Sequence, residues 1–179
     1  MLRGAPPAVQ TTTTTCGGQM QAILKTLFVG ALLAIGTSAV LADSPASDPA
    51  IGAWKLNLAK SKFSPGPAPK SQTRTYVESA QGVTLTIKNT AADGKESTLT
   101  VTFKDDGKPH PVTGNPDFDS VTVKHVDAGT THGTQMKAGV IVSTSVRSVS
   151  KDGKTLTFAQ KGTRANGVAF DDLSVYDRQ

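Results

Sequence analysis

Short runs of alternating apolar and polar residues, separated by turn sequences, follow one another from residue 51 to the end of the chain. Side chains on a β-strand point alternately to opposite faces, so each run predicts a strand whose apolar face we expect to face the core. Dipeptides such as Asp93-Gly94 and Asn166-Gly167 between the runs are typical of tight hairpin turns. The positions that share a face within the runs are Trp54-Leu56-Leu58, Thr73-Thr75-Val77, Val83-Leu85-Ile87, Leu99-Val101-Phe103, Val121-Val123-His125, Val140-Val142-Val146, Leu156-Phe158, Val168-Phe170 and Leu173-Val175.

This pattern predicts an all-β fold of about 8–10 strands with little helical periodicity. Because the turns are short, consecutive strands are expected to be antiparallel neighbours in an up-and-down meander. A meander of this length leaves two unpaired edges, and closure into a barrel removes them. The pattern therefore favours a closed barrel over residues 51–179, with a two-sheet β-sandwich as the alternative. Alternation is the same in a packed and in a hollow barrel, so the state of the interior is left open.

The only tryptophan in the chain, Trp54, lies in the first predicted strand, two residues after Gly52. A large aromatic side chain in this place is expected to fill the core. The Gly52-x-Trp54 motif resembles the opening of lipocalins and of the related fatty-acid-binding proteins, which share the calycin barrel. The resemblance implies a closed lipocalin-like barrel in which Trp54 closes one end and a basic residue near the last strand, here Arg178, packs over it as a cation on the indole. Gly52, Trp54 and Arg178 are therefore the expected closure residues.

The last predicted strand departs from one feature of the fatty-acid-binding proteins. The resemblance implies an Arg-x-Tyr pair that holds a lipid carboxylate, and the matching positions here are Ser174 and Tyr176. Tyr176 fits the pattern as a hydrogen-bond donor to a ligand, whereas Ser174 does not. The usual carboxylate clamp of that family is therefore not expected at these two positions.

A second resemblance covers most of residues 51–179. The segments 54–71, 113–117 and 150–154 are similar to those of a group of small secreted bacterial proteins. The activity of that group is uncharacterised, so this resemblance implies secretion and a shared fold but no reaction.

The first 42 residues contain no acidic residue, and their features predict export. Lys25 precedes an apolar stretch over residues 26–35, and the small-residue sequence 40–42 ends in Ala42. These are the three parts of a cleavable signal peptide, which we place at residues 20–42 with cleavage after Ala42. Residues 1–19 are interpreted as an over-extended N-terminus and residues 43–50 as a flexible leader. The expected location is periplasmic or secreted, with no stable membrane anchor after cleavage.

Charge and cysteine usage narrow the functional classes. From Asp43 onward the chain holds 17 of its 19 basic residues and all 14 acidic residues, a net charge of +3. This mild charge, without clustering, argues against a nucleic-acid partner. The single cysteine, Cys16, lies before the predicted cleavage site, so disulfides and cysteine-based metal sites or nucleophiles are excluded from the predicted mature chain.

The three histidines offer the few candidates for chemistry. His125 shares its face with Val121 and Val123 and is expected to point inward, either as a hydrogen-bonded interior group or as a ligand contact. The spacings of the histidines match no compact metal motif, and no catalytic sequence motif is present, so no metal, cofactor or catalytic residue is expected.

These observations predict an exported, non-enzymatic protein that binds a small apolar or amphipathic molecule, with His125 and Tyr176 as the candidate ligand-binding residues. The alternative is a solid barrel with a structural or protein-interaction role in the cell envelope, whose protein partner the sequence does not name. A hydrolase or isomerase is a third hypothesis, and it needs His125 and a carboxylate within hydrogen-bond reach in one cavity.

Overall fold

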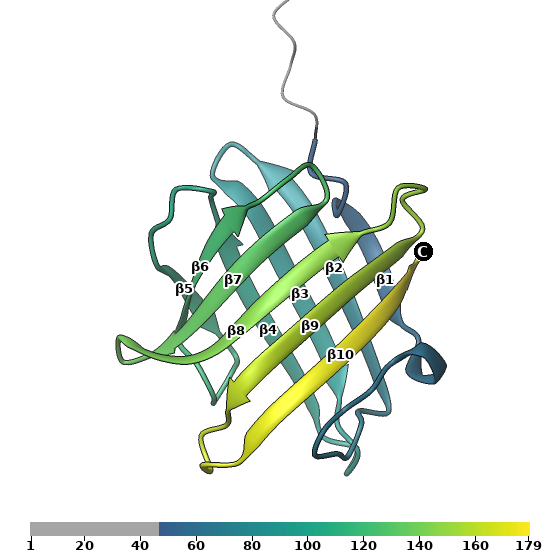
Figure 1. Ribbon diagram of the computed structural model, residues 1–179, viewed down its shortest axis with the longest axis vertical. Coiled ribbons are helices and arrows are strands. Elements are labelled where there is room, and N and C mark those ends of the chain that lie inside the picture. The colour runs from purple at the N-terminus through teal and green to yellow at the C-terminus, as the bar shows by residue number, and fades with distance from the viewer. Residues whose placement is uncertain (1–46) are drawn as a thin grey trace, which may run out of the picture. The chain divides into compact units, whose positions relative to one another are not determined.

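The computed structural model describes residues 47–179, which form ten strands and one short 3-10 helix (Figure 1). The predicted signal peptide, the residues before it and the first part of the predicted leader lie outside the described residues. The elements are β1 (Gly52–Leu56), η1 (Leu58–Lys60), β2 (Ser71–Ser79), β3 (Gly82–Thr90), β4 (Glu96–Phe103), β5 (His110–Thr113), β6 (Ser120–His125), β7 (Thr130–Lys137), β8 (Val140–Val149), β9 (Thr155–Thr163) and β10 (Ala169–Arg178).

Each strand pairs antiparallel with the next along the chain, and β10 pairs with β1 to complete the ring. The closing register places Trp54 opposite Arg178 and Leu56 opposite Tyr176. The prediction of an all-β, up-and-down closed barrel is confirmed, and the two-sheet sandwich is wrong. The architecture is consistent with a calycin-like fold. Closure gives every strand a paired neighbour on both sides, which is the physical reason that a meander of this length forms a ring.

The hydrophobic core lies at the end of the barrel where β1 begins and β10 ends. Trp54, Leu156 and Tyr176 are the largest fully buried side chains, and they lie on neighbouring strands at this end. Ala50, just before β1, is also fully buried and accepts a hydrogen bond from the indole Nε1 of Trp54 at 2.7 Å. The chain entering β1 therefore closes this end from outside.

Along β3, β4 and β6 the inward face is the apolar one, as the alternation predicts. Val101 and Phe103 on β4 and Val121 and Val123 on β6 are buried in the core cluster, and Leu85 on β3 packs against it. These strands bury their valines, leucines and phenylalanines together because removal of apolar surface from water is the main favourable term in folding.

Along β2, β8 and β10 the inward face is the polar one, and the prediction from the apolar residues is wrong. Val77 is 55% exposed and Val140 is 66% exposed, so the faces that hold them look outward. A β-bulge after Gln135, where the β7–β8 register shifts, also changes the alternation on this side of the barrel. The polar residues that are buried on these three strands are Arg74, Ser143, Ser145, Arg147 and Ser174.

Candidate functional site: an interior cavity with an unpaired arginine

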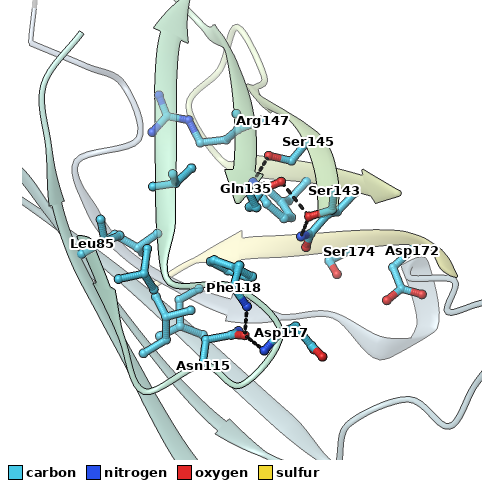
Figure 2. A pocket seen from close by; sticks show the side chains of 18 of the residues that line it. Leu85, Asn115, Asp117, Phe118, Gln135, Ser143, Ser145, Arg147, Asp172 and Ser174 are labelled. Carbon is cyan, nitrogen blue, oxygen red and sulfur yellow. Dashed lines mark hydrogen bonds between the residues drawn. The ribbon is translucent and has the colours of Figure 1, made fainter. Parts of the chain in front are cut away.

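The barrel is hollow on the side away from the Trp54 end. A cavity of about 470 Å³ is lined from Phe103, Thr131 and Arg147, near the closed end, to Phe118 and Asp117 of the β5–β6 loop and Phe170 of β10 at the opposite end (Figure 2). Cavities of roughly 300–1,000 Å³ hold small organic ligands. The interior is therefore not filled by side chains, and its volume suits one small molecule.

One wall of the cavity is apolar. Leu85 and Ile87 on β3 and Leu99 and Val101 on β4 face it, and β5 and β6 continue the apolar surface. On this wall, hydrogen-bonding side chains line the cavity only near its mouth, the end opposite Trp54. An apolar wall of this kind stabilises a hydrocarbon surface by removing it from water, by about 25 cal/mol per Å².

The facing wall, on β7, β8 and β9, is a chain of hydrogen-bonded polar side chains (Figure 2). Gln135 donates from Nε2 to Ser145 Oγ at 2.8 Å and accepts at Oε1 from Ser143 Oγ at 2.9 Å. Gln160 donates from Nε2 to Ser143 Oγ at 3.0 Å. We call these four residues the polar ladder. Mutual hydrogen bonding removes most of the free-energy cost of burying them.

Arg74 on β2 is the most unusual residue of the cavity lining. It is only 5% exposed, its Nε donates to the Tyr176 hydroxyl at 3.0 Å, and its guanidinium lies 3.8 Å from the centroid of the Phe158 ring. The Tyr176 hydroxyl in turn donates to Gln72 Oε1.

The charge of Arg74 has no counter-ion among residues 47–179, and its buried Nη1 has no hydrogen-bond partner there. Burial opposes the charged form, while the Tyr176 and Tyr76 hydroxyls around it favour that form, and the pKa of Arg74 is raised. The guanidinium is therefore charged. The Tyr176 hydroxyl and the Phe158 and Tyr176 rings stabilise this charge, and the guanidinium lines the cavity with no carboxylate beside it among residues 47–179.

A second buried arginine, Arg147 on β8, also lines the cavity and also has one buried nitrogen, Nε, without a hydrogen-bond partner among the described residues, but its charge is neutralised. Its Nη2 donates to Asp48 Oδ2 and to Thr131 Oγ1, both at 2.7 Å. Burial raises the pKa of Asp48, but the charge of Arg147, the Ala50 amide and His125 together lower it by more. The pKa of Asp48 therefore lies below its ordinary value. Asp48 is therefore an ionised counter-ion at neutral pH, and Arg74 is left as the buried arginine that lacks one.

His125 lies at the closed end of the barrel rather than among the residues that line the cavity. Its Nε2 is 3.5 Å from Asp48 and its Nδ1 is 3.4 Å from Asp105. The histidine–carboxylate contact that the hydrolase or isomerase hypothesis needs is thus present, but away from the cavity wall. Within residues 47–179 no group of three or more His, Cys, Asp or Glu side chains is placed to hold a metal ion.

Gly52, Trp54 and Arg178 come together at the closed end. The Arg178 guanidinium lies 4.2 Å from the centroid of the Trp54 ring and donates from Nη1 to the Ile51 carbonyl at 2.9 Å and from Nη2 to the Pro49 carbonyl at 2.5 Å. A Cβ atom on Gly52 would lie 2.8 Å from Arg178 Nη1, so the absence of a side chain there lets Arg178 reach these carbonyls.

Of the two predicted ligand contacts, Tyr176 is fully buried and does not itself line the cavity. It accepts a hydrogen bond from Arg74, which does line it. The sequence reasoning missed Arg74 and the polar ladder. One signal was available: Gln72, Arg74 and Tyr76 form a polar set on one face of the predicted strand, opposite the face that holds Val77. Sequence alone gives no reason to turn that set inward.

No model of a known protein family matches the chain, and no curated protein is significantly similar to it in sequence. Among the described residues there is no helix with the length and apolar character needed to cross a bilayer.

Proposed function

We propose that this protein is an exported, lipocalin-like binding protein whose interior cavity takes an amphipathic anion, with the acidic group on Arg74 and the hydrocarbon against β3 and β4. The observation that carries the proposal is the buried guanidinium of Arg74, which lines a cavity with one apolar wall and has no counter-ion among residues 47–179. Export rests on the predicted signal peptide. The hollow interior is what favours binding over a solid structural barrel.

A carboxylate is the anion that suits this site. Arginine binds carboxylates through two parallel N–H donors, and charged hydrogen bonds of this kind contribute about 1.5–3 kcal/mol each. The Tyr176 hydroxyl lies beside the guanidinium, 3.0 Å from Nε. An arginine–tyrosine pair is thus present although position 174 is a serine, because the arginine comes from β2 rather than from the last strand.

The first test is isothermal titration calorimetry of the purified protein with dodecanoate and with dodecanol, which has the same chain but no charge. We expect dodecanoate to bind and Arg74→Met to weaken it about 10- to 100-fold, because at least one charged hydrogen bond is lost. The control is Arg164→Met, since Arg164 at the mouth already has a partner, Asp172, at 3.0 Å. Its effect on dodecanoate should be small.

Thermal unfolding separates binding from a structural role of Arg74. Replacement of buried charged residues by apolar side chains of similar volume is often neutral or stabilising. We therefore expect Arg74→Met to melt at the wild-type temperature or above it while binding is lost. Equal binding of dodecanoate by the variant and the wild type would contradict the proposal, and so would equal binding of dodecanol and dodecanoate by the wild type.

A further inference from the structure

The cavity changes from apolar to polar around its circumference. In the ring of ten strands β8 is five steps from β3 and β9 is five steps from β4, so the polar ladder faces the apolar wall across the cavity. Figure 2 shows Leu85 on one side and Gln135, Ser143 and Ser145 on the other. A ligand between these walls meets apolar atoms on one flank and hydrogen-bonding groups on the opposite flank.

The polar ladder keeps hydrogen-bonding capacity for a ligand. Among the described residues the Ser145 hydroxyl accepts from Gln135 but donates to no protein group, and the Oε1 of Gln160 accepts from none. A hydroxyl group can both donate and accept, so it can satisfy either of these groups. A plain hydrocarbon chain on this wall would leave both unsatisfied, at about 1–3 kcal/mol each.

Two glycines keep this wall flat at the ladder. A Cβ on Gly133 would lie 2.6 Å from Ser145 Oγ, and a Cβ on Gly162 would lie 2.3 Å from the Ser143 Cβ. Any larger residue at either position would push into the ladder. The missing side chains let the serine hydroxyls and glutamine amides form one continuous polar surface.

The ladder lies close to Arg74. Arg74 stacks on Phe158, and Gln160 lies two residues farther along the same face of β9, toward the mouth. Two residues along a strand span roughly 7 Å. A rigid ligand held at Arg74 by its acid group therefore extends along the ladder toward the mouth.

From this partition we propose that the ligand is a facially amphipathic acid: a rigid, polycyclic carboxylate that carries hydroxyl groups on one face and hydrocarbon on the other. This inference rests on the proposed function, since it assumes that Arg74 holds the acid. A straight-chain fatty acid divides polar from apolar along its length, which does not match walls that differ from side to side. The hydroxylated face lies on the polar ladder, and the hydrocarbon face lies on β3 and β4.

The test compares three probes by isothermal titration calorimetry on the purified protein: cholate, which has hydroxyls on one face, cholanate, which has the same rings and carboxylate without hydroxyls, and dodecanoate. We expect cholate to bind at least about tenfold more tightly than cholanate, because sites built to hydrogen-bond a hydroxyl reject the analogue that lacks it. In Ser145→Ala and in Gln160→Met, each of which removes one of the free groups, this ratio should fall toward one. Ser148→Ala, on the opposite face of β8 from Ser145, is the matched control and should keep the ratio.

The outcomes separate the two proposals. Equal or weaker binding of cholate than of cholanate, with dodecanoate still bound through Arg74, overturns the facial ligand and leaves the proposed function intact. A cholate preference that persists in both ladder variants also overturns it, because the preference then arises elsewhere. If none of the three anions binds, both proposals fail.

Discussion

At the scale of single residues, closure of the barrel depends on Gly52. Its backbone φ is +125°, a conformation that residues with a side chain rarely adopt, and its missing Cβ leaves room for Arg178 Nη1. Through that space Arg178 covers Trp54. The Gly-x-Trp spacing in the sequence therefore corresponds to one local contact, in which a glycine makes room for the cation that stacks on the tryptophan.

We expect Gly52→Ala to destabilise the fold by about 1–3 kcal/mol, because it adds backbone strain and displaces Arg178. Urea unfolding followed by Trp54 fluorescence measures this change. Gly107→Ala is the control, since Gly107 also has a positive φ, of +66°, but a Cβ added there would meet no atom within 4 Å. That variant should lose only the backbone part, about 1 kcal/mol. Equal losses in the two variants would show that the contact with Arg178 does not matter.

At the scale of elements, the segment before β1 is attached to the barrel by its own charge pair. Asp48 has only 8% of its side chain exposed and bonds Arg147 of β8, 99 residues away in sequence. Arg178 of β10 binds the next carbonyl, that of Pro49. The chain entering β1 is thereby linked to two other strands at the closed end.

We expect Asp48→Asn to lower the free energy of unfolding by about 2 kcal/mol at pH 7, because it removes the counter-ion of a buried arginine. The value is below that of a fully buried pair because Asp48 lies at the end of the barrel. The pKa of Asp48 is lower in the folded protein than in the unfolded chain. Its contribution is therefore complete above the unfolded pKa of about 4 and is lost as the pH falls through the lower folded value.

The measurement is chemical unfolding of wild type and Asp48→Asn from pH 7 to pH 2.5. The gap between the two curves should be constant at neutral pH and should narrow below about pH 4. Asp106→Asn, at an exposed turn where the carboxylate accepts from the Lys108 amide, serves as control and should give a smaller gap. A gap for Asp48→Asn that is independent of pH would contradict the assignment of Asp48 as the ionised counter-ion of Arg147.

Individual strands also differ in how well hydrophobic alternation predicts which face is inside. On β4 and β6 the apolar residues are inside, as predicted, because one face is clearly apolar. On β8 the serines Ser143 and Ser145 alternate with Val142, Thr144 and Val146, and hydrophobicity selects the wrong face. The polar face is stable inside because Gln135 of β7 and Gln160 of β9 supply hydrogen bonds from neighbouring strands. Those partners are distant enough in sequence that alternation along one strand cannot reveal them.

At the scale of the whole molecule, the barrel is packed at one end and hollow at the other. Trp54, Leu156 and Tyr176 fill the closed end, and the cavity runs to the β5–β6 and β9–β10 connections. Asp117 Oδ1 accepts from the Ala165 amide at 2.8 Å and so links these two connections at the mouth. A ligand would enter at this end.

Export is a prediction at the same scale, and it concerns residues outside the described part of the chain. Expressed with its own N-terminus in a Gram-negative host, the protein should be recovered from the periplasm with Asp43 as its first residue. N-terminal sequencing and intact mass measure this directly. Ala42→Gln is the control and should leave an unprocessed form, because cleavage needs a small residue there. A membrane-retained, uncleaved wild type would contradict the prediction.

The sequence by itself determined that the chain is an up-and-down β-barrel, because period-2 alternation and tight-turn dipeptides are local properties and closure follows from the unpaired edges of a long meander. It also pointed to Trp54 and Arg178. Only the tertiary structure decided which face of β2, β8 and β10 is inside, that the interior is hollow, and that Arg74 lies there without a counter-ion. The physical reason is that alternation shows which side chains share a face, whereas the direction of that face depends on partners supplied by other strands once the ring has closed.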